Sequence, residues 1–234
     1  MRLHLLHTTL LLLILIEGIE AQNHRYSVSL SGSYTTSSKI YHSYDEIDPA
    51  RRDQFFSLSD IFGIGIDIRR EFHDLRLQVG ISAEYLETHE NISYIISPST
   101  SISVTDGFSA IPIEITGYFL IPVPLPRWKI SVGTGVGFYW GSREYSYASV
   151  YPKPLERKIG IGIHVVTGVE FSLSEMFGIR TEVKFREVQF WSSEGFTETS
   201  IVLQDQVIVL SQEKIKSRIS VDGMMLSAGI VYHL

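Results

Sequence analysis

The segment Trp128–Trp140, WKISVGTGVGFYW, decides the fold. Every second position, from Trp128 to Trp140, is apolar apart from Thr134, whereas positions 129 to 137 between them carry lysine, serine and three glycines. Because successive side chains of a strand point to opposite faces, this pattern predicts one apolar face and one small, polar face. Tryptophan at both ends of the apolar face is typical of a strand that crosses a membrane between its two interfaces.

The same period of two recurs along the chain, in segments 26–34, 62–68, 75–85, 111–119, 159–171, 179–185 and 224–234. The connections between consecutive segments alternate between long and short. Transmembrane barrels have this asymmetry, together with an even number of strands. We therefore predict an all-β fold: an eight-stranded antiparallel up-and-down transmembrane β-barrel with short periplasmic turns and long extracellular loops. The first long loop would run from Thr35 to about Asp60, and the next from Thr88 to Gly107.

Aromatic residues lie at both ends of the predicted strands, which predicts two girdles at the membrane interfaces. The girdle at the short turns would contain Tyr26, Phe72, Phe119, Trp128, Phe171 and Tyr232, and the girdle at the long loops Tyr34, Phe62, Tyr85, Phe108, Trp140 and Phe190.

The alternation changes parity near Glu187. Val188 and Phe190 are apolar at the parity that carries Lys184 and Arg186 just before them. An extra residue in a bulged strand would shift the pattern in this way. We therefore predict a β-bulge where this strand leaves the membrane.

The N-terminus has the features of a secretory signal peptide over residues 1–21. Arg2 precedes an apolar run that is too short for a spanning helix, and Ala21 is a small residue suited to the cleavage position. The barrel domain would then be 22–234 and would be exported. The chain contains no cysteine, which excludes a disulfide framework.

The charge pattern gives no sign of a nucleic-acid partner or a cofactor. The net charge is −6, or −5 after removal of residues 1–21, and there is no run of Lys and Arg, no zinc-ligand spacing and no basic stripe with interleaved aromatic residues. We expect no nucleic-acid binding, no metal and no cofactor.

A soluble lipocalin-like barrel is the main alternative fold, because it alternates with its apolar residues pointing inward. Three features favour the membrane barrel: the polar face mixes full charges with many glycines, the loops alternate in length, and both rims are aromatic. Glycines inside a narrow barrel would leave room for long charged side chains across the lumen.

The predicted lumen face carries charges of both signs in nearly equal number. The acidic residues are Asp67, Glu84, Glu114, Glu170 and Glu182, and the basic residues are Arg69, Arg76, Lys129, Arg180, Lys184 and Arg186. Unpaired charges in a narrow interior would cost about several kcal/mol each. We therefore predict a lumen polar network of ion pairs that closes the barrel.

The last residues carry the most specific motif. The chain ends Gly229-Ile-Val-Tyr232-His-Leu234, which resembles the C-terminal assembly signal of small eight-stranded bacterial outer-membrane barrels of the OmpX, OmpW and OmpA-barrel type. Leu234 stands where that family usually has phenylalanine or tryptophan. The resemblance covers the chain after residue 21. It implies folding by the barrel assembly machinery, residence in the bacterial outer membrane and contact with outer-membrane lipids.

The long loops are the predicted working surface. Residues 199–203 and 207–210 alternate around Gln204-Asp205-Gln206, which predicts a β-hairpin beyond the bilayer. An exposed sheet edge can pair with a strand of another molecule. We therefore expect a structural or surface-binding, adhesive role, with a possible surface partner at these loops.

Two other roles remain open at this stage. A conduit for small apolar molecules, which the OmpW resemblance allows, would need an apolar path that the charged lumen does not suggest. A lipid-modifying barrel enzyme would need a base and a nucleophile in reach of each other. His164 is isolated among glycines, and the group His42, Ser43 and Asp45 is of a kind common in turns. We predict no catalytic residues and no enzymatic activity.

Overall fold

The computed structural model describes residues 26–42, 44–97, 100–147, 150–203, 206–210 and 214–234. The predicted signal peptide, 1–21, and the predicted start of the barrel domain at residue 22 lie outside the described residues. The α-helix α2 (Pro49–Arg52) is a single turn. Within the described residues, no helix has both the length and the apolar character that a membrane span requires.

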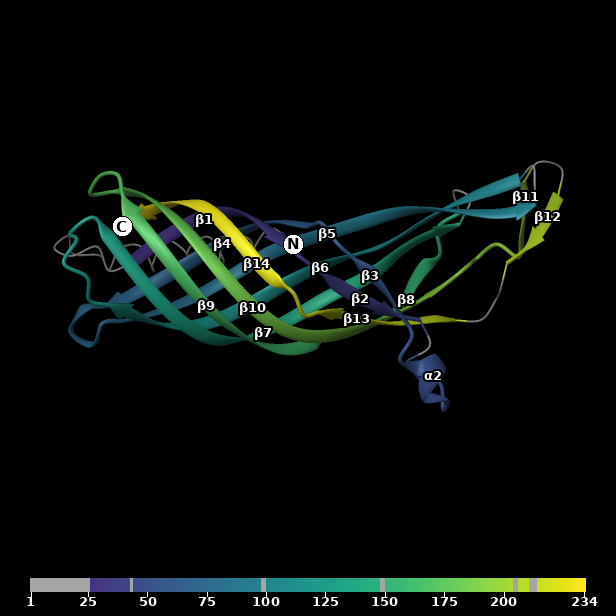
Figure 1. The fold of residues 1–234 in the computed structure, drawn as a ribbon, viewed down its shortest axis with the longest axis horizontal. Helices are drawn as coiled ribbons and strands as arrows, with labels where there is room; N and C mark the ends of the chain where they lie inside the picture. The colour runs from purple at the N-terminus through teal and green to yellow at the C-terminus, as the bar shows by residue number, and fades with distance from the viewer. Residues whose placement is uncertain (1–25, 43, 98–99, 148–149, 204–205, 211–213) are drawn as a thin grey trace, which may run out of the picture.

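Eight antiparallel strands form a closed ring (Figure 1). Each ring strand pairs with the next ring strand along the chain, and the last, β14, pairs with the first, β1, which closes the barrel. The predicted eight-stranded antiparallel up-and-down barrel is confirmed. The ring strands are β1 (Tyr26–Thr35), β4 (Ile61–Phe72), β5 (Leu77–Ser97), β6 (Thr100–Ile121), β7 (Trp128–Tyr147), β9 (Gly160–Ser172), β10 (Phe177–Gly195) and β14 (Met224–His233).

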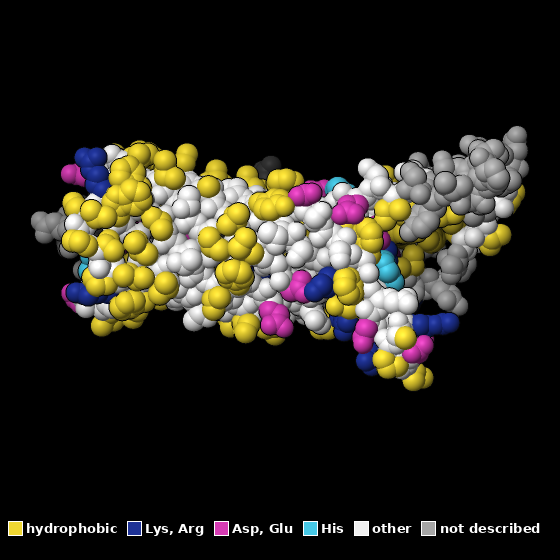
Figure 2. Space-filling model, in the orientation of Figure 1, with side chains coloured by type: hydrophobic (Ala, Val, Ile, Leu, Met, Phe, Trp, Pro, Cys, Tyr) yellow, Lys and Arg dark blue, Asp and Glu magenta, His cyan; other side chains and the backbone are white. Residues whose placement is uncertain are grey.

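The apolar side chains point outward and the charged ones inward. On β4, Ile64, Ile66 and Ile68 are exposed on the outer wall, whereas Asp67 and Arg69 are buried in the lumen. Figure 2 shows hydrophobic side chains gathered over the barrel part of one face. The soluble lipocalin-like alternative, which needs the opposite orientation, is therefore wrong.

The strands continue beyond the predicted loop boundaries. β5 and β6 remain paired up to Ser97 and Thr100, so the segment expected to be the loop Thr88–Gly107 is a long two-stranded ribbon. β7 runs to Tyr147 and β10 to Gly195. The side with long connections is therefore built of β-structure more than of irregular loops (Figure 1).

Four accessory strands complete this extracellular end. They are β2 (Ser38–Tyr41), β3 (Phe55–Leu58), β8 (Lys153–Lys158) and β13 (Ile215–Val221). β13 extends the line of β14 along the same edge of β10, and the hairpin of β2 and β3 pairs with β13. The turn after β3 reaches β5, where Thr88 Oγ1 donates a hydrogen bond to Ser59 O over 3.0 Å. β2, β3 and β13 contribute buried apolar side chains to the interior above the charged part of the lumen, whereas every residue of β8 is exposed.

The interior at this level is filled by a cluster that we call the apolar plug. Its members are Ile40, Leu58, Ile61, Leu86, Phe108, Ala110, Tyr139, Val188, Phe190, Ile219 and Val221, none exposed by more than 2%. Apart from the Tyr139 hydroxyl, they offer no polar side-chain group to the lumen. The described barrel therefore has a charged lower interior and an apolar upper interior.

The predicted bulge near Glu187 is wrong. β10 is continuous from Phe177 to Gly195, and burial alternates without interruption through Arg186, Glu187 and Val188. The apolar residues at positions 188 and 190 keep the inward parity and belong to the plug. The change from Lys184 and Arg186 to Val188 and Phe190 marks the level at which the filling of the barrel changes from ion pairs to apolar side chains.

Most of the predicted girdle residues lie on the outer rims. Trp128 packs against Phe171 at one rim, with 4.8 Å between ring centroids, and the ring of Tyr34 lies 5.6 Å from that of Phe62 at the other. The assignments of Phe108 and Phe190 to the girdle are wrong, because both rings are buried and contact each other edge to face inside the plug.

Candidate functional site

The lower lumen holds a network of ion pairs, the lower network, between β4, β9 and β10. Arg69 donates to Asp67 and to Glu182, each over 2.7 Å. Arg180 reaches Asp67 and Glu170, each over 2.8 Å. Because Asp67 accepts from both guanidinium groups, the two halves of the network are joined, and the lumen at this level is crossed by side chains.

A second group of pairs, the upper network, lies between the lower network and the apolar plug. Lys184 and Tyr139 both donate to the Glu114 carboxylate. Arg186 pairs with Glu84 over 3.2 Å. Lys184, Glu114 and Arg186 are almost fully buried, so each charge depends on its partner to offset the loss of hydration.

Lys129 lies at the periplasmic mouth, where it pairs with Glu71 over 2.9 Å. Gln78 donates to the same carboxylate over 3.0 Å. Sequence analysis did not include Glu71 among the site residues, although it continues the inward parity of Asp67 and Arg69 on β4. Its parity was the signal that could have found it.

The assignment of Arg76 to the lumen is wrong. Arg76 is exposed and follows the 3₁₀ turn His73–Leu75 as its cap, with φ 53° in the left-handed region. The strand begins only at Leu77. Alternation cannot show where a turn ends, and here the turn includes two residues more than the pattern suggested, Leu75 and Arg76.

Glycines in the lumen make room for these side chains. At Gly135 an added Cβ would lie 2.7 Å from the His164 ring, and at Gly137 it would lie 2.8 Å from the Tyr139 ring. These two side chains face the lumen, as the glycines do, and occupy the space that the glycines leave. The charged side chain of Glu114 also uses this space, because its Cγ would lie 3.0 Å from a Cβ added at Gly137.

His164 takes part in a buried chain of three polar side chains. Its Nε2 is 2.8 Å from Thr116 Oγ1, and its Nδ1 is 3.8 Å from Glu114 Oε1. Hydroxyl, imidazole and carboxylate follow in the order used by nucleophilic enzymes. Thr116 and His164 are both only 2% exposed, so this group has no open approach for a substrate in the described structure.

Above the apolar plug, a further buried pair joins β6 and β7. Arg143 donates two hydrogen bonds to the Asp106 carboxylate, over 2.7 and 2.6 Å, and a third to Ser217 on β13 over 3.2 Å. Glu194 on β10 is buried in the same region. Sequence analysis missed this layer because it treated these residues as loop.

The C-terminal residues of the predicted assembly signal lie on β14 and just after it. Tyr232 and Leu234 point outward and are exposed, and Tyr232 packs against Phe177 with 5.2 Å between ring centroids. Gly229 faces the β1 backbone, where an added Cβ would lie 2.4 Å from Leu30 O. The outward rim position leaves the two large side chains accessible.

The predicted hairpin beyond the bilayer is present. β11 (Ser200–Leu203) and β12 (Gln206–Val209) form a separate two-stranded antiparallel sheet at the far extracellular end (Figure 1). Of the predicted turn Gln204-Asp205-Gln206, residues 204–205 lie outside the described residues, and Gln206 is the first residue of β12. Val207 and Val209 are 67% and 79% exposed, which places apolar side chains in water at this end.

Comparisons with known proteins rest on structure. No family model matches the chain, and no curated protein matches its sequence. The Neisserial surface protein A is similar in structure, with a TM-score of 0.50, 14% identity, and coverage of 89% of this chain and 97% of that protein. Ail, the attachment invasion locus protein of Yersinia pestis, is similar with a TM-score of 0.40 and 14% identity over 90% of this chain and all of Ail.

The prediction of no enzymatic activity is corrected by a third structure. The outer-membrane protease OmpT from Escherichia coli matches with a TM-score of 0.44 and 9% identity, covering 92% of this chain and 99% of OmpT. Barrels of this kind thus include an enzyme, and the exclusion of catalysis does not stand. A likeness at this level assigns no activity to this chain.

The loop group His42, Ser43 and Asp45 gives no support for a particular chemistry. Ser43 lies outside the described residues, and Asp45 pairs with Lys216.

The ring, the outward apolar face and the structural neighbours agree with each other. The chain has the fold of the small bacterial outer-membrane β-barrel proteins, as its sequence resemblance predicted.

Proposed function

We propose that this protein is an integral protein of the bacterial outer membrane that keeps its lumen closed and binds a surface partner through its extracellular β-structure. The observation that carries the proposal is the filling of the lumen in successive layers. The lower and upper networks of ion pairs are followed by the apolar plug, and the Arg143–Asp106 pair lies above it.

This layering favours a closed barrel over a conduit. An ion would have to displace paired charges and then cross a group of apolar side chains that offers it no hydration. A small apolar molecule would meet the opposite difficulty, because the apolar plug leads into a lumen of ionic groups. Neither class of solute finds a continuous path of suitable polarity.

The extracellular hairpin of β11 and β12 supports the binding role. A two-stranded sheet has unpaired backbone groups along both outer edges, and such edges accept a strand from another molecule. Val207 and Val209 would supply apolar contacts on one face of that strand. The partner that fits is an extended peptide segment of another protein.

The route to the membrane follows the family resemblance. We infer export by the N-terminal segment 1–21 and folding by the barrel assembly machinery, with Gly229, Tyr232 and Leu234 as the recognised residues. Outer-membrane lipids then cover the outward apolar face. The accessible rim position of Tyr232 and Leu234 supports this role.

Two measurements test the proposal. In planar bilayers, the refolded protein should produce no conductance above that of the bare bilayer, and stable ion-conducting steps would contradict the closed lumen. For binding, proteoliposomes carrying the protein are incubated with an array of immobilised extended peptides. Retention on some of these peptides is expected.

The matched variants separate the hairpin from the rest of the extracellular surface. Val207→Lys with Val209→Lys should abolish peptide retention, because two exposed apolar side chains that a bound peptide would cover become charged. Leu155→Lys, which alters an exposed apolar residue on β8, should leave retention unchanged. Absence of retention by the wild-type protein, or equal retention by the double variant, would contradict strand binding at the hairpin.

A further inference from the structure

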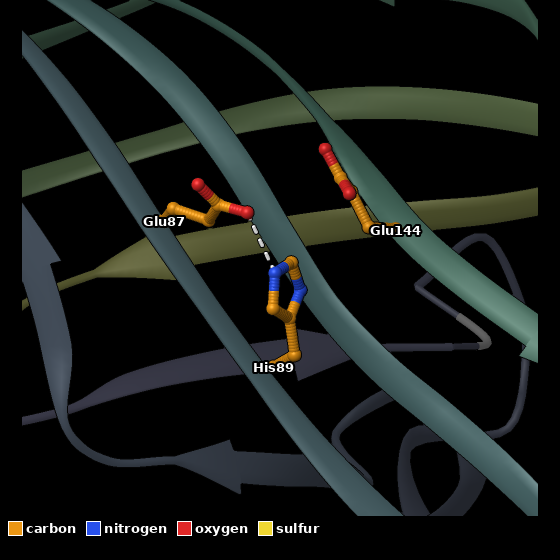
Figure 3. A group of neighbouring side chains, drawn as sticks. All are labelled: Glu87, His89 and Glu144. Carbon is orange, nitrogen blue, oxygen red and sulfur yellow. Dashed lines mark hydrogen bonds and ion pairs between the residues drawn. The ribbon is translucent and has the colours of Figure 1, made fainter.

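Three potential metal ligands converge on the outer wall of the barrel. Glu87 and His89 lie on β5, and Glu144 lies on β7 (Figure 3). One ligand atom from each lies within 4.8 Å of the others. His89 Nε2 is already 2.6 Å from Glu87 Oε1. The arrangement gathers one imidazole and two carboxylates from two strands that are not neighbours.

The register of β5, β6 and β7 explains why these side chains meet. Gly107 of β6 pairs with His89 on one side and with Glu144 on the other. Because Gly107 has no side chain, nothing stands between the imidazole and the carboxylate. An added Cβ there would lie 2.0 Å from Thr88 O, so the close approach of β5 and β6 requires glycine at this position.

A groove of about 440 Å³ opens beside two of the three ligands. It is lined by Ser59, Asp60, Phe62, Glu87, Thr88, His89 and Glu90, among which there is no lysine or arginine. The carboxylates of Asp60 and Glu90 are held in place by Tyr34 OH at 2.9 Å and by Ser59 N at 3.3 Å. The groove therefore presents an excess of negative charge that attracts cations from solution.

The three ligands lie just above the extracellular aromatic rim. Tyr85 precedes Glu87 on the same outward face of β5, and Trp140 precedes Glu144 on that of β7; both rings are exposed on the outer wall. Aromatic rings of this kind mark the membrane–water interface. The ligands thus stand on the aqueous side of the rim, where a dissolved metal ion has access to them.

From this geometry we propose that Glu87, His89 and Glu144 form a binding site for a divalent transition metal of the Zn²⁺ class. Carboxylate oxygens alone would suit Ca²⁺ or Mg²⁺, but the imidazole nitrogen selects for Zn²⁺ and related ions. Zn²⁺ binds nitrogen and oxygen ligands at about 2.0–2.2 Å. Small side-chain rotations bring the three ligand atoms to that distance, and water fills the remaining position.

Metal binding here has a structural consequence. The ion would join β5 to β7 across β6, at the base of the ribbon that projects beyond the membrane. Because a ligand that binds only the folded state stabilises it, occupancy should raise the thermal stability of the protein. The site is independent of the proposed hairpin binding, since it lies on other strands.

Isothermal titration of the refolded, untagged chain with ZnCl₂ in detergent tests the site. The wild-type protein should bind one ion, and His89→Ala and Glu144→Gln should each weaken binding by about tenfold or more. A shift in gel mobility between the unboiled and the boiled sample, equal to that of the wild type, verifies that the barrel of each variant is folded. Ca²⁺ or Mg²⁺ at the same concentration should not displace Zn²⁺.

His73→Ala is the matched control, because His73 is also exposed and lies 3.3 Å from a glutamate, Glu71, but at the opposite rim, where the described residues supply no third ligand. It should bind Zn²⁺ as the wild type does. No binding to the wild type, displacement by Ca²⁺, or equal losses in His73→Ala and His89→Ala would each overturn the proposal. An undiminished affinity of His89→Ala or Glu144→Gln would also overturn it.

Discussion

The Arg180 guanidinium reaches across the lumen to Asp67, with 2.8 Å between Nη1 and Oδ1, although β14 and β1 separate their strands in the wall. The same guanidinium holds Glu170 over 2.8 Å. One arginine thus compensates two buried carboxylates from two different strands. Backbone hydrogen bonds close the wall, and the ion pairs of Arg180 add contacts across the lumen between β10, β4 and β9.

Replacing Arg180 should therefore destabilise the barrel strongly. Arg180→Met removes the cation from one side of Asp67 and leaves Glu170 with only His233, whose Nε2 is 3.1 Å away, and breaking a buried pair in this way costs about 3–5 kcal/mol. The measurement is urea unfolding in lipid vesicles. Arg76→Met is the control, because Arg76 is exposed at a turn and its loss should change the free energy of unfolding by less than about 0.5 kcal/mol. Equal effects of the two variants would argue against the network.

The Lys184–Glu114 pair should show strong energetic coupling. Lys184→Met leaves the Glu114 charge buried without its ammonium partner, and Glu114→Gln leaves the ammonium group without a carboxylate. The double variant removes both charges, so it should be more stable than the sum of the two single effects indicates, by about 0.5–3 kcal/mol. A double-mutant cycle of unfolding free energies measures this coupling, and simple additivity would contradict it.

The apolar plug and the ion-pair networks should close the lumen independently. Phe190→Ala removes a fully buried ring and should lower stability by about 3–5 kcal/mol. It should not produce conductance, because both networks lie below it. Phe190→Ala combined with Lys184→Ala and Glu114→Ala should also not conduct, because the lower network still crosses the lumen. Recordings in planar bilayers check this, and conductance of Phe190→Ala alone would show that the plug is the only barrier.

The barrel could be predicted from sequence because its wall obeys one rule over its whole length. Ile64, Ile66 and Ile68 must face lipid, so the residues between them must face the lumen, and the charged partners follow from parity alone. The same rule would have included Glu71. It misplaced Arg76, because a residue in a turn and a residue in a strand can occupy the same position in a period of two.

The upper interior could not be predicted in this way. Apolar residues at inward positions, such as Val188 and Phe190, produce the same sequence pattern as a bulge with apolar residues facing outward. The two differ only in what the other strands contribute, here Ile40 from β2 and Ile219 from β13. Those strands lie in segments that a membrane model treats as loops. Above the membrane, the packing of other strands therefore determines which face of β10 points into the barrel, and the sequence of β10 alone does not.

Glu194 should make the stability of the extracellular end depend on pH. It is only 2% exposed, and burial raises the pKa of its carboxyl, with Ser192 and Arg143 opposing that change in part. A raised pKa in the folded state means that the folded protein binds a proton more tightly than the unfolded chain. Stability should therefore fall as the pH rises from the unfolded pKa of about 4.3 through the folded value.

Glu194→Gln removes this titration and should make the protein more stable than the wild type at pH 7, with the difference disappearing below about pH 4. Unfolding of both proteins at pH values from about 3.5 to 8 measures the effect. Glu156→Gln, which alters an exposed glutamate on β8, should show no such gain. If Glu194→Gln were destabilising at pH 7, the buried carboxylate would be a stabilising partner of Arg143, and the direction assigned to its pKa would be wrong.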